Sequence, residues 1–167
     1  MKMKKKAGFT FVELILYIAI VTIMLSALVP FAWNIIGAAS KSNTEQEVFS
    51  QARFVSERIK YEIRSATGIN SVAATSISLV TLVPATNPTV IDFAGGNIRV
   101  KQGVGVVVVM NSPDVVISGL TFTNNTSGDN KTKNISYVFT LSANYGSTRQ
   151  EFVETTTIRS SAEVRTN

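Results

Sequence analysis

The residue with the clearest chemical consequence is Glu13, the only charged side chain between Phe9 and Ser40. The residues around it are mostly apolar, and the run is long enough to cross a hydrocarbon core about 30 Å thick. A carboxylate in such a segment costs roughly 2.5 to 3.5 kcal/mol on insertion scales, so it needs a partner. Four lysines precede the run: Lys2, Lys4, Lys5 and Lys6. Because basic residues mark the cytoplasmic end of a span, we expect an N-terminal anchor with the later residues exported.

Two missing residue types restrict the catalytic chemistry open to this chain. It has no cysteine and no histidine. Thiol and histidine-assisted nucleophiles, disulfides and the usual transition-metal sites are therefore excluded, which leaves carboxylate, lysine or tyrosine chemistry. Asp92, Asp114 and Asp129 are too scattered for a calcium loop, and Gly103-Val104-Gly105 lacks the third glycine and following helix of a nucleotide loop. We expect no catalytic residue, metal or cofactor.

The positive charge is concentrated at the N-terminus. The formal net charge is +5, but without the four N-terminal lysines 12 Lys and Arg remain against 11 Asp and Glu, or +1. A nearly neutral remainder does not indicate a nucleic-acid partner, and we predict none.

The segment from Lys4 to Val21 resembles the leader of a type IV prepilin. The resemblance implies that a membrane-embedded prepilin peptidase cuts between Gly8 and Phe9 and methylates the new amine of Phe9. Glu13 matches the glutamate of that family, and Pro30 resembles the proline farther along its helix. The implied partners are other pilin or pseudopilin subunits, the peptidase, an inner-membrane assembly platform and, before assembly, membrane lipid. The implied location is a single pass through the cytoplasmic membrane, followed by a filament outside the cytoplasm.

A role for Glu13 follows from the charge that cleavage would create. The α-amino group of Phe9 would carry the opposite charge, and pairing it with Glu13 of an adjacent subunit would neutralise both groups in an apolar bundle. A slip of one residue would leave two buried charges unpaired, so the pairing would set the register between subunits.

Other interpretations of the N-terminus remain open. Gly37-Ala38-Ala39-Ser40 could pass for the cleavage site of a secretory signal, but the apolar run exceeds the roughly 7 to 15 residues of a signal core. The chain could also be a membrane-anchored binding or adhesion module with an uncleaved N-terminus. A secreted β-rich enzyme using a carboxylate pair is a further alternative.

The second part of the chain predicts a helix followed by β-strands, an α+β fold. Apolar residues recur at spacings of three and four in one stripe: Val48, Ala52, Val55, Ile59, Ile63 and Ala66. The charged residues from Glu45 to Arg64 mostly occupy the other faces, and Gly68 is the expected helix stop. We expect a leader at 1–8, a transmembrane assembly helix at 9–36, its amphipathic continuation at 37–68, and an antiparallel β-rich domain at 69–167 packed on the stripe.

Three local features of the sequence oppose one continuous helix from the membrane segment to the amphipathic stripe. Pro30 removes a backbone donor, Gly37 is a poor helix former, and Ser42-Asn43-Thr44-Glu45 matches a capping box that could open a separate helix. We therefore expect a kink at Pro30 or a local unwinding in this region.

Short β-rich runs separated by turn residues predict the strands, at 77–83, 89–93, 98–101, 104–110, 115–123, 135–143 and 150–159. Gly95-Gly96 and Asn144-Tyr145-Gly146-Ser147 are the expected hairpin turns. Val106-Val107-Val108-Val109 favours a strand buried on both faces, or an edge that another subunit covers.

Several later segments are similar to signatures of the J-type and W-type minor pilins and pseudopilins. They are Glu57 to Ala66, Ile91-Asp92-Phe93, Gly96-Asn97-Ile98-Arg99, Gly119-Leu120-Thr121-Phe122 and Ile158-Arg159. The lack of cysteines departs from the disulfide-looped major pilins. Four asparagines also begin Asn-x-Ser/Thr sequences, namely Asn124, Asn125, Asn130 and Asn134, which chance alone can produce in a polar loop.

Overall fold

The computed structural model describes residues 8–129 and 131–165. The four basic leader lysines and Asn130 lie outside the described residues, so of the predicted leader only Gly8 is described. The chain divides into two compact units, one ending at Ser40 and the other beginning at Lys41.

One helix, α1, runs from Phe11 to Ser65. It passes through Pro30, Gly37 and the predicted capping box at Ser42 without a break. The expected local unwinding and the separate helix are therefore wrong, because the intrinsic cost of one proline and one glycine is small beside the helical bonds on both sides. A kink at Pro30 stays a prediction. The helix ends three residues before Gly68, which is already in a strand.

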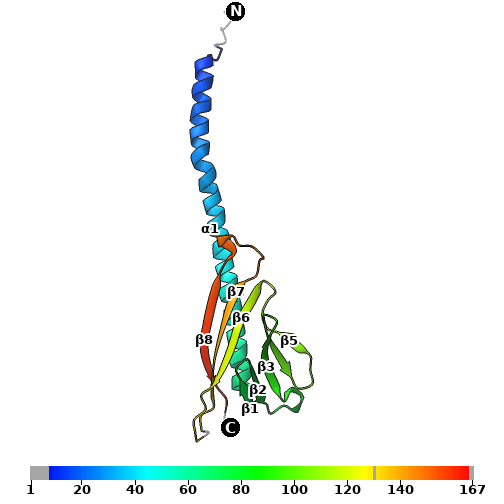
Figure 1. Cartoon of the computed structure of the whole chain (residues 1–167). Helices are drawn as coiled ribbons and strands as arrows, with labels where there is room; N and C mark the ends of the chain where they lie inside the picture. Colours follow the sequence, from blue (N-terminus) through cyan, green and yellow to red (C-terminus); the bar gives the residue numbers. More distant parts are fainter. Residues whose placement is uncertain (1–7, 130, 166–167) are drawn as a thin grey trace, which may run out of the picture. The chain divides into compact units, whose positions relative to one another are not determined.

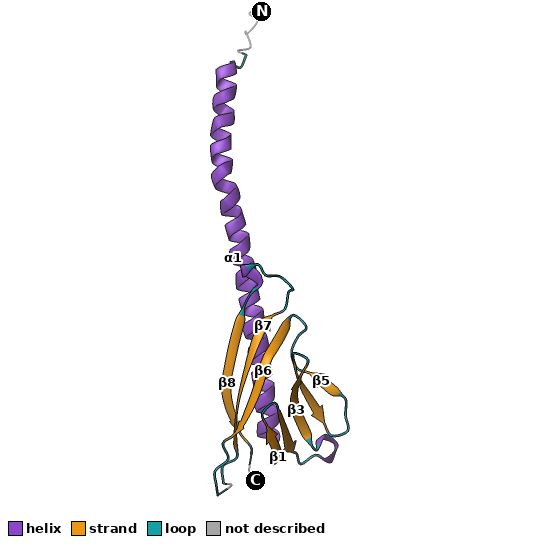
Figure 2. Ribbon diagram, in the orientation of Figure 1, coloured by secondary structure: helices purple, strands orange, loops and turns teal. Residues whose placement is uncertain are grey.

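The second unit contains two antiparallel sheets (Figure 1). The first has the order β1-β2-β3-β4-β5, and the second has the order β6-β7-β8. The strands are β1 (Gly68–Ala73), β2 (Ser76–Val80), β3 (Thr89–Ala94), β4 (Asn97–Gln102), β5 (Val107–Val109), β6 (Val115–Asn124), β7 (Asn134–Ala143) and β8 (Thr155–Glu163). Short 3-10 helices occupy Pro84–Thr86 and Gln150–Phe152. Figure 2 shows the long strands β6, β7 and β8 side by side along the helix of this unit.

The core of this unit confirms the predicted helical stripe. All six stripe residues, Val48, Ala52, Val55, Ile59, Ile63 and Ala66, have no exposed surface. They belong to one cluster that also contains buried residues of both sheets, among them Ile77, Ile91 and Phe139. The predicted α+β fold, a long N-terminal helix packed with antiparallel sheet, is confirmed.

Hydrogen bonds fix the helix of the second unit against β7 and against the segment that precedes β8. Tyr137 on β7 donates its hydroxyl hydrogen to the Ser56 carbonyl and accepts a bond from the Ser56 hydroxyl, both at 2.9 Å. Near the start of this unit, Lys41 Nζ donates to the Val153 carbonyl at 2.7 Å and to Glu154 Oε2 at 2.5 Å. Glu154 accordingly raises the pKa of the Lys41 ammonium. These bonds add direction to an apolar contact that by itself has none.

Glu62 is an exception among the charged residues of the helix, because it is buried with 2 % of its surface exposed. Its Oε1 lies 2.7 Å from Arg58 Nη2, and Gln102 Nε2 on β4 donates to both carboxylate oxygens at 3.3 and 3.2 Å. The guanidinium of Arg58 also lies 5.6 Å from the ring centre of Tyr61. The Arg58–Glu62 ion pair is formed within one helical turn, and Gln102 connects this pair to the first sheet.

The two sheets meet where β6 contacts the turns of the first sheet. The Ile117 amide donates to the Gly96 carbonyl at 2.9 Å, and the Phe122 amide donates to the Ala74 carbonyl at 2.8 Å. Gly95 and Gly96 both have positive φ, as the predicted tight β3–β4 hairpin requires. A Cβ at Gly96 would lie 2.8 Å from Val116 Cγ2, so this close approach also requires glycine.

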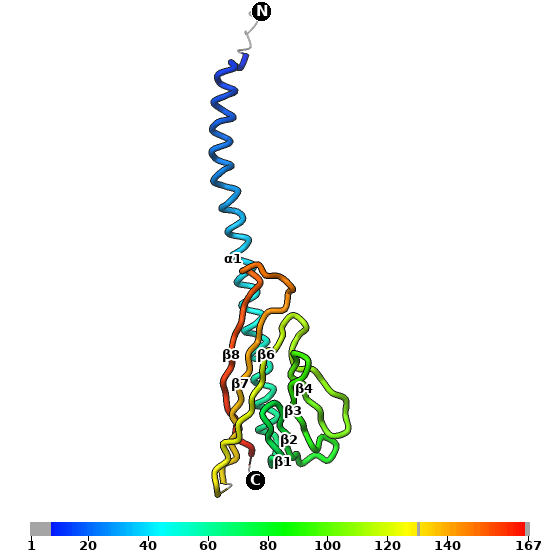
Figure 3. Tube along the Cα trace, viewed as in Figure 1, coloured from blue at the N-terminus to red at the C-terminus, as the bar shows by residue number. Residues whose placement is uncertain are grey.

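Several strand predictions are wrong in extent. Strand β1 is missing from the prediction because its sequence, Gly-Ile-Asn-Ser-Val-Ala, is too polar for the pattern. The run 104–110 contains only the three-residue edge strand β5, exposed along its length. Its burial on both faces is therefore wrong, and its cover by another subunit stays a prediction. The last strand begins at Thr155 because Gln150–Phe152 forms a 3-10 turn. The Cα trace in Figure 3 follows this longer β7–β8 connection.

Ile59→Asp tests the shared core of helix and sheets. The carboxylate would be buried without a partner, so we expect a loss of about 3 kcal/mol or more, which corresponds to a fall in melting temperature of about 10 °C. Circular dichroism of the full-length chain in detergent micelles measures this melting. Arg64→Asp at an exposed helical position is the control, and equal effects of the two changes would contradict the assignment of the packed face.

A double-mutant cycle tests the buried carboxylate. Arg58→Leu leaves Glu62 with Gln102 alone and should destabilise the unit by about 2 kcal/mol, less than for a fully buried pair because 41 % of the Arg58 side chain is exposed. Arg58→Leu combined with Glu62→Leu should recover most of this loss, because no buried charge remains. Additive effects in thermal melting of the full-length chain would show that the two side chains are not coupled.

Candidate processing and assembly site

Helix α1 begins next to the predicted cleavage position. Gly8, Phe9 and Thr10 precede the helix and are exposed. The Thr10 hydroxyl accepts a bond from the Glu13 amide at 3.3 Å, so Thr10 is the N-cap and Glu13 lies in the first turn. A Cβ built at Gly8 meets no atom within 4 Å. The described fold therefore does not itself require glycine at this position.

The Glu13 carboxylate forms no hydrogen bond or ion pair with any residue that the structure describes. It lies close to the helix N-terminus, whose partial positive charge stabilises an anion by only about 0.3 to 1 kcal/mol. Phe11, Val12 and Leu14 beside it are all exposed. Glu13 is thus a carboxylate without a partner on an apolar helical surface.

This surface continues along the whole first unit. The large apolar side chains from Phe11 to Ile36 are exposed, apart from the half-buried Val21. By length and composition the helix can cross a membrane. Its serine and threonine between Glu13 and Pro30 donate to helix carbonyls, Thr22 to Ile18 at 2.8 Å and Ser26 to Ile23 at 2.7 Å. These hydroxyls need no outside partner in lipid, unlike Glu13.

Gly8 and Phe9 directly precede the helix and Glu13 lies in its first turn, whereas Pro30 lies several turns farther along it. Proline at position 30 cannot donate to the carbonyl of Ser26, so the backbone has one helical bond fewer there. The capping role of Thr10 is absent from the prediction, although Thr-x-x-Glu before an apolar run is a capping-box pattern.

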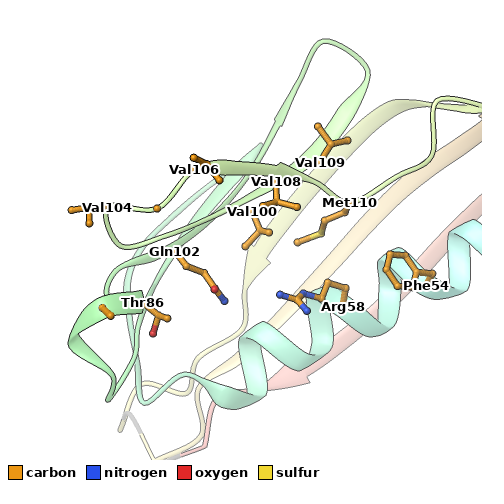
Figure 4. Close-up of a pocket in the computed structure, with 12 residues that line it drawn as sticks. Phe54, Arg58, Thr86, Val100, Gln102, Val104, Val106, Val108, Val109 and Met110 are labelled. Carbon is orange, nitrogen blue, oxygen red and sulfur yellow. The ribbon is translucent and has the colours of Figure 1, made fainter.

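The described part of the second unit has grooves beside its helix that were not predicted from the sequence. One, of about 550 Å³, lies between the helix and β5 (Figure 4). Its walls are mainly apolar, from Phe54 on the helix and Val100, Val106, Val108 and Met110 on the sheet side. Figure 4 shows the polar ends of Arg58 and Gln102 pointing toward each other between the helix and β4. Because these two side chains bind the buried Glu62 carboxylate, their polar groups are part of the Glu62 cluster and not of the groove.

The other groove, of about 810 Å³, lies between the helix and the edge strand β8. It is lined by Phe49, Arg53, Glu57 and Lys60 of the helix, among others, and by Ile158 to Ser160 of β8. Its basic side chains distinguish it from the apolar groove at β5.

Residues 3–29 match the prokaryotic N-terminal methylation motif. The match contains Gly8, Phe9 and Glu13 and ends one residue before Pro30. No curated protein and no solved structure matches the chain. The motif, together with a helix that can cross a membrane, supports a type IV pilin-like prepilin that is processed by prepilin peptidase and methylated. Proteins with this motif are structural subunits, and their anchoring in the inner membrane agrees with the apolar helix.

Proposed function

We propose that this chain is a minor pilin or pseudopilin of a type IV pilus or a type II secretion-like filament. It is cut between Gly8 and Phe9, methylated on Phe9 and incorporated through its N-terminal helix. In this proposal the segments 1–8, 9–36, 37–68 and 69–167 are the leader, the membrane and assembly helix, its amphipathic continuation and the globular domain. The domain is carried outside the cytoplasm.

The observation that carries the proposal is the unpaired carboxylate of Glu13, four residues beyond Phe9 within the matched motif. In lipid, or in a bundle of apolar helices, such a charge is costly unless it is neutralised. Cleavage before Phe9 creates an amine at the same end of the helix, with an ordinary pKa near 8. The amine of one subunit and the carboxylate of its neighbour then satisfy each other, and the paired charges define the register between subunits.

The minor-pilin or pseudopilin assignment has support from where its similar segments lie. Ile91-Asp92-Phe93 lies in β3, Gly96 to Arg99 forms the end of a hairpin turn and the start of β4, and Gly119 to Phe122 lies in β6. Ile158-Arg159 lies in the last strand. These are the hairpin, core-strand and final-strand positions that the resemblance implies.

A membrane-anchored binding module with an uncleaved leader is the competing function, and the exposed grooves of the second unit favour it. The mass of the mature N-terminus distinguishes the two. A chain that begins at Phe9 with one added methyl group supports the pilin proposal, whereas a chain that begins at Met1 supports the anchored module.

Gly8→Val tests the cleavage position. Because the described chain leaves space at Gly8, the substitution should not disturb folding, but a branched side chain should not fit a peptidase that accepts glycine. We expect the leader to remain attached, which immunoblots of membrane fractions would detect as a heavier species. Gly37→Val, within helix α1 and outside the motif match, is the control. Cleavage of the Gly8 variant as efficient as that of the parent would show that the site is wrong.

Glu13→Gln tests the charge pairing, since it keeps the size and hydrogen bonding of the side chain and removes the charge. The variant should enter the membrane and be cleaved, yet its share in sheared filaments relative to the membrane pool should fall about tenfold, as expected if register is lost with the pair. Glu13→Leu should lower the share in filaments by a similar factor, because it also leaves the amine of the neighbouring subunit unpaired. Normal incorporation of both variants would rule out this mechanism.

A further inference from the structure

The edge strand β8 has unused backbone hydrogen-bonding groups along most of its length. Among the strands of the described residues, it pairs with β7 alone. Two bonds fix which residue pairs of the β7–β8 ladder are hydrogen-bonded. The Ala143 amide donates to the Glu154 carbonyl, and the Val164 amide donates to the Lys133 carbonyl. Because hydrogen-bonded pairs alternate along an antiparallel ladder, the backbone groups of Thr155, Thr157, Arg159 and Ser161 point away from β7. They form a template for one more strand.

The helix beside this edge carries a row of charges on the flank next to the core stripe. Arg53, Glu57, Lys60 and Arg64 recur at spacings of four, three and four, so they share one helical face. Lys60 donates to Glu57 at 2.9 Å, and that bond, with the positive charges of Lys60, Arg64 and Arg53, lowers the pKa of the Glu57 carboxyl. The one carboxylate of the row is thus already neutralised by its neighbour.

Several arginines along the same side have no such compensation. Arg53 and Arg159 line the groove at β8, and Arg64 and Arg165 line the hollows that follow it. None of these four forms an ion pair with a described residue. Two carboxylates line the same groove and hollows, Glu57 on the helix and Glu163 at the end of β8. Positive charge therefore exceeds negative charge along this groove, whereas the second unit as a whole is nearly neutral.

We propose that this groove binds an extended, carboxylate-bearing segment of another polypeptide, which adds to β8 as a fourth antiparallel strand. Its backbone would bond to the outward groups of β8, and its alternate side chains would face the helix, where Arg53 and the basic groove select carboxylates. The exposed rings of Phe49 and Phe54 would cover the apolar parts of those side chains. The proposal does not rest on cleavage of the leader or on filament assembly.

A polypeptide fits these observations better than a nucleic acid. Both would be attracted by the arginines, but only a polypeptide backbone matches the donor and acceptor spacing of the free strand edge. The carboxylates of Glu57 on the helix and Glu163 on β8 also weaken the attraction of this side of the unit for a continuous phosphate chain.

The direct test is the binding of a dye-labelled peptide, (Thr-Glu)4, to the full-length chain in nanodiscs of zwitterionic lipid, measured by fluorescence anisotropy. We expect the peptides (Thr-Gln)4 and (Thr-Lys)4 to bind more weakly. N-methylation of the threonines should abolish binding, because in an antiparallel fourth strand those residues bond to β8 while the glutamates face the helix. N-methylation of the glutamates should be tolerated. Equal binding of the threonine-methylated and parent peptides would overturn strand addition.

Protein variants test the charges. Arg53→Gln should weaken binding of (Thr-Glu)4 roughly threefold, as expected for one exposed ion pair. Lys101→Gln removes the same charge from β4, and it should leave binding unchanged. Equal loss in both variants would overturn the assignment to this groove. Tighter binding of a twelve-residue oligothymidylate than of the peptide, lost in the arginine variant, would assign the groove to nucleic acid and overturn the proposal.

Discussion

The structure of the second unit depends on one apolar stripe of helix α1 that serves as the core of two sheets. A three-stranded sheet and a five-stranded sheet with a short exposed edge have little core of their own. Both bury their inner faces against Val48, Val55, Ile59 and Ile63, which have no exposed surface. Because those contacts are made by one helix, the positions of the sheets are linked through it. The bonds from Tyr137, Gln102 and Lys41 then fix the helix in rotation and along its axis.

The same helix meets a different requirement in the first unit. There the apolar residues occupy all sides, which suits lipid or other apolar helices and leaves no polar face for water. Glu13 is the exception, and its carboxylate has no partner within the described chain. The buried carboxylate of the second unit, Glu62, shows the contrast, since Arg58 and Gln102 satisfy it internally. The fold thus provides partners for the Glu62 carboxylate, whereas a neighbouring molecule must provide the partner for the Glu13 carboxylate.

Surface charge divides the second unit in a similar way. The groove at β5 has apolar walls, and its arginine is already paired, so it presents no net charge. The groove at β8 presents unpaired arginines beside a free strand edge. A composition that is nearly neutral conceals this separation, because net charge says nothing about which side chains share a face. The prediction that no nucleic acid binds rested on this net charge, which averages over all faces of the unit.

The sequence by itself determined the features that depend on local order along the chain. The lone Glu13 in an apolar run, the Gly8-Phe9 junction and the helical stripe at spacings of three and four are all readable without a structure, because they rest on helical periodicity and on the polarity of neighbouring residues. Only the tertiary structure decided that Glu62 is buried, that β1 pairs through a polar segment, and that Val107 to Val109 lies at an exposed edge. Each of these depends on which distant strand lies alongside, and such long-range pairing leaves no periodic signal in a single sequence.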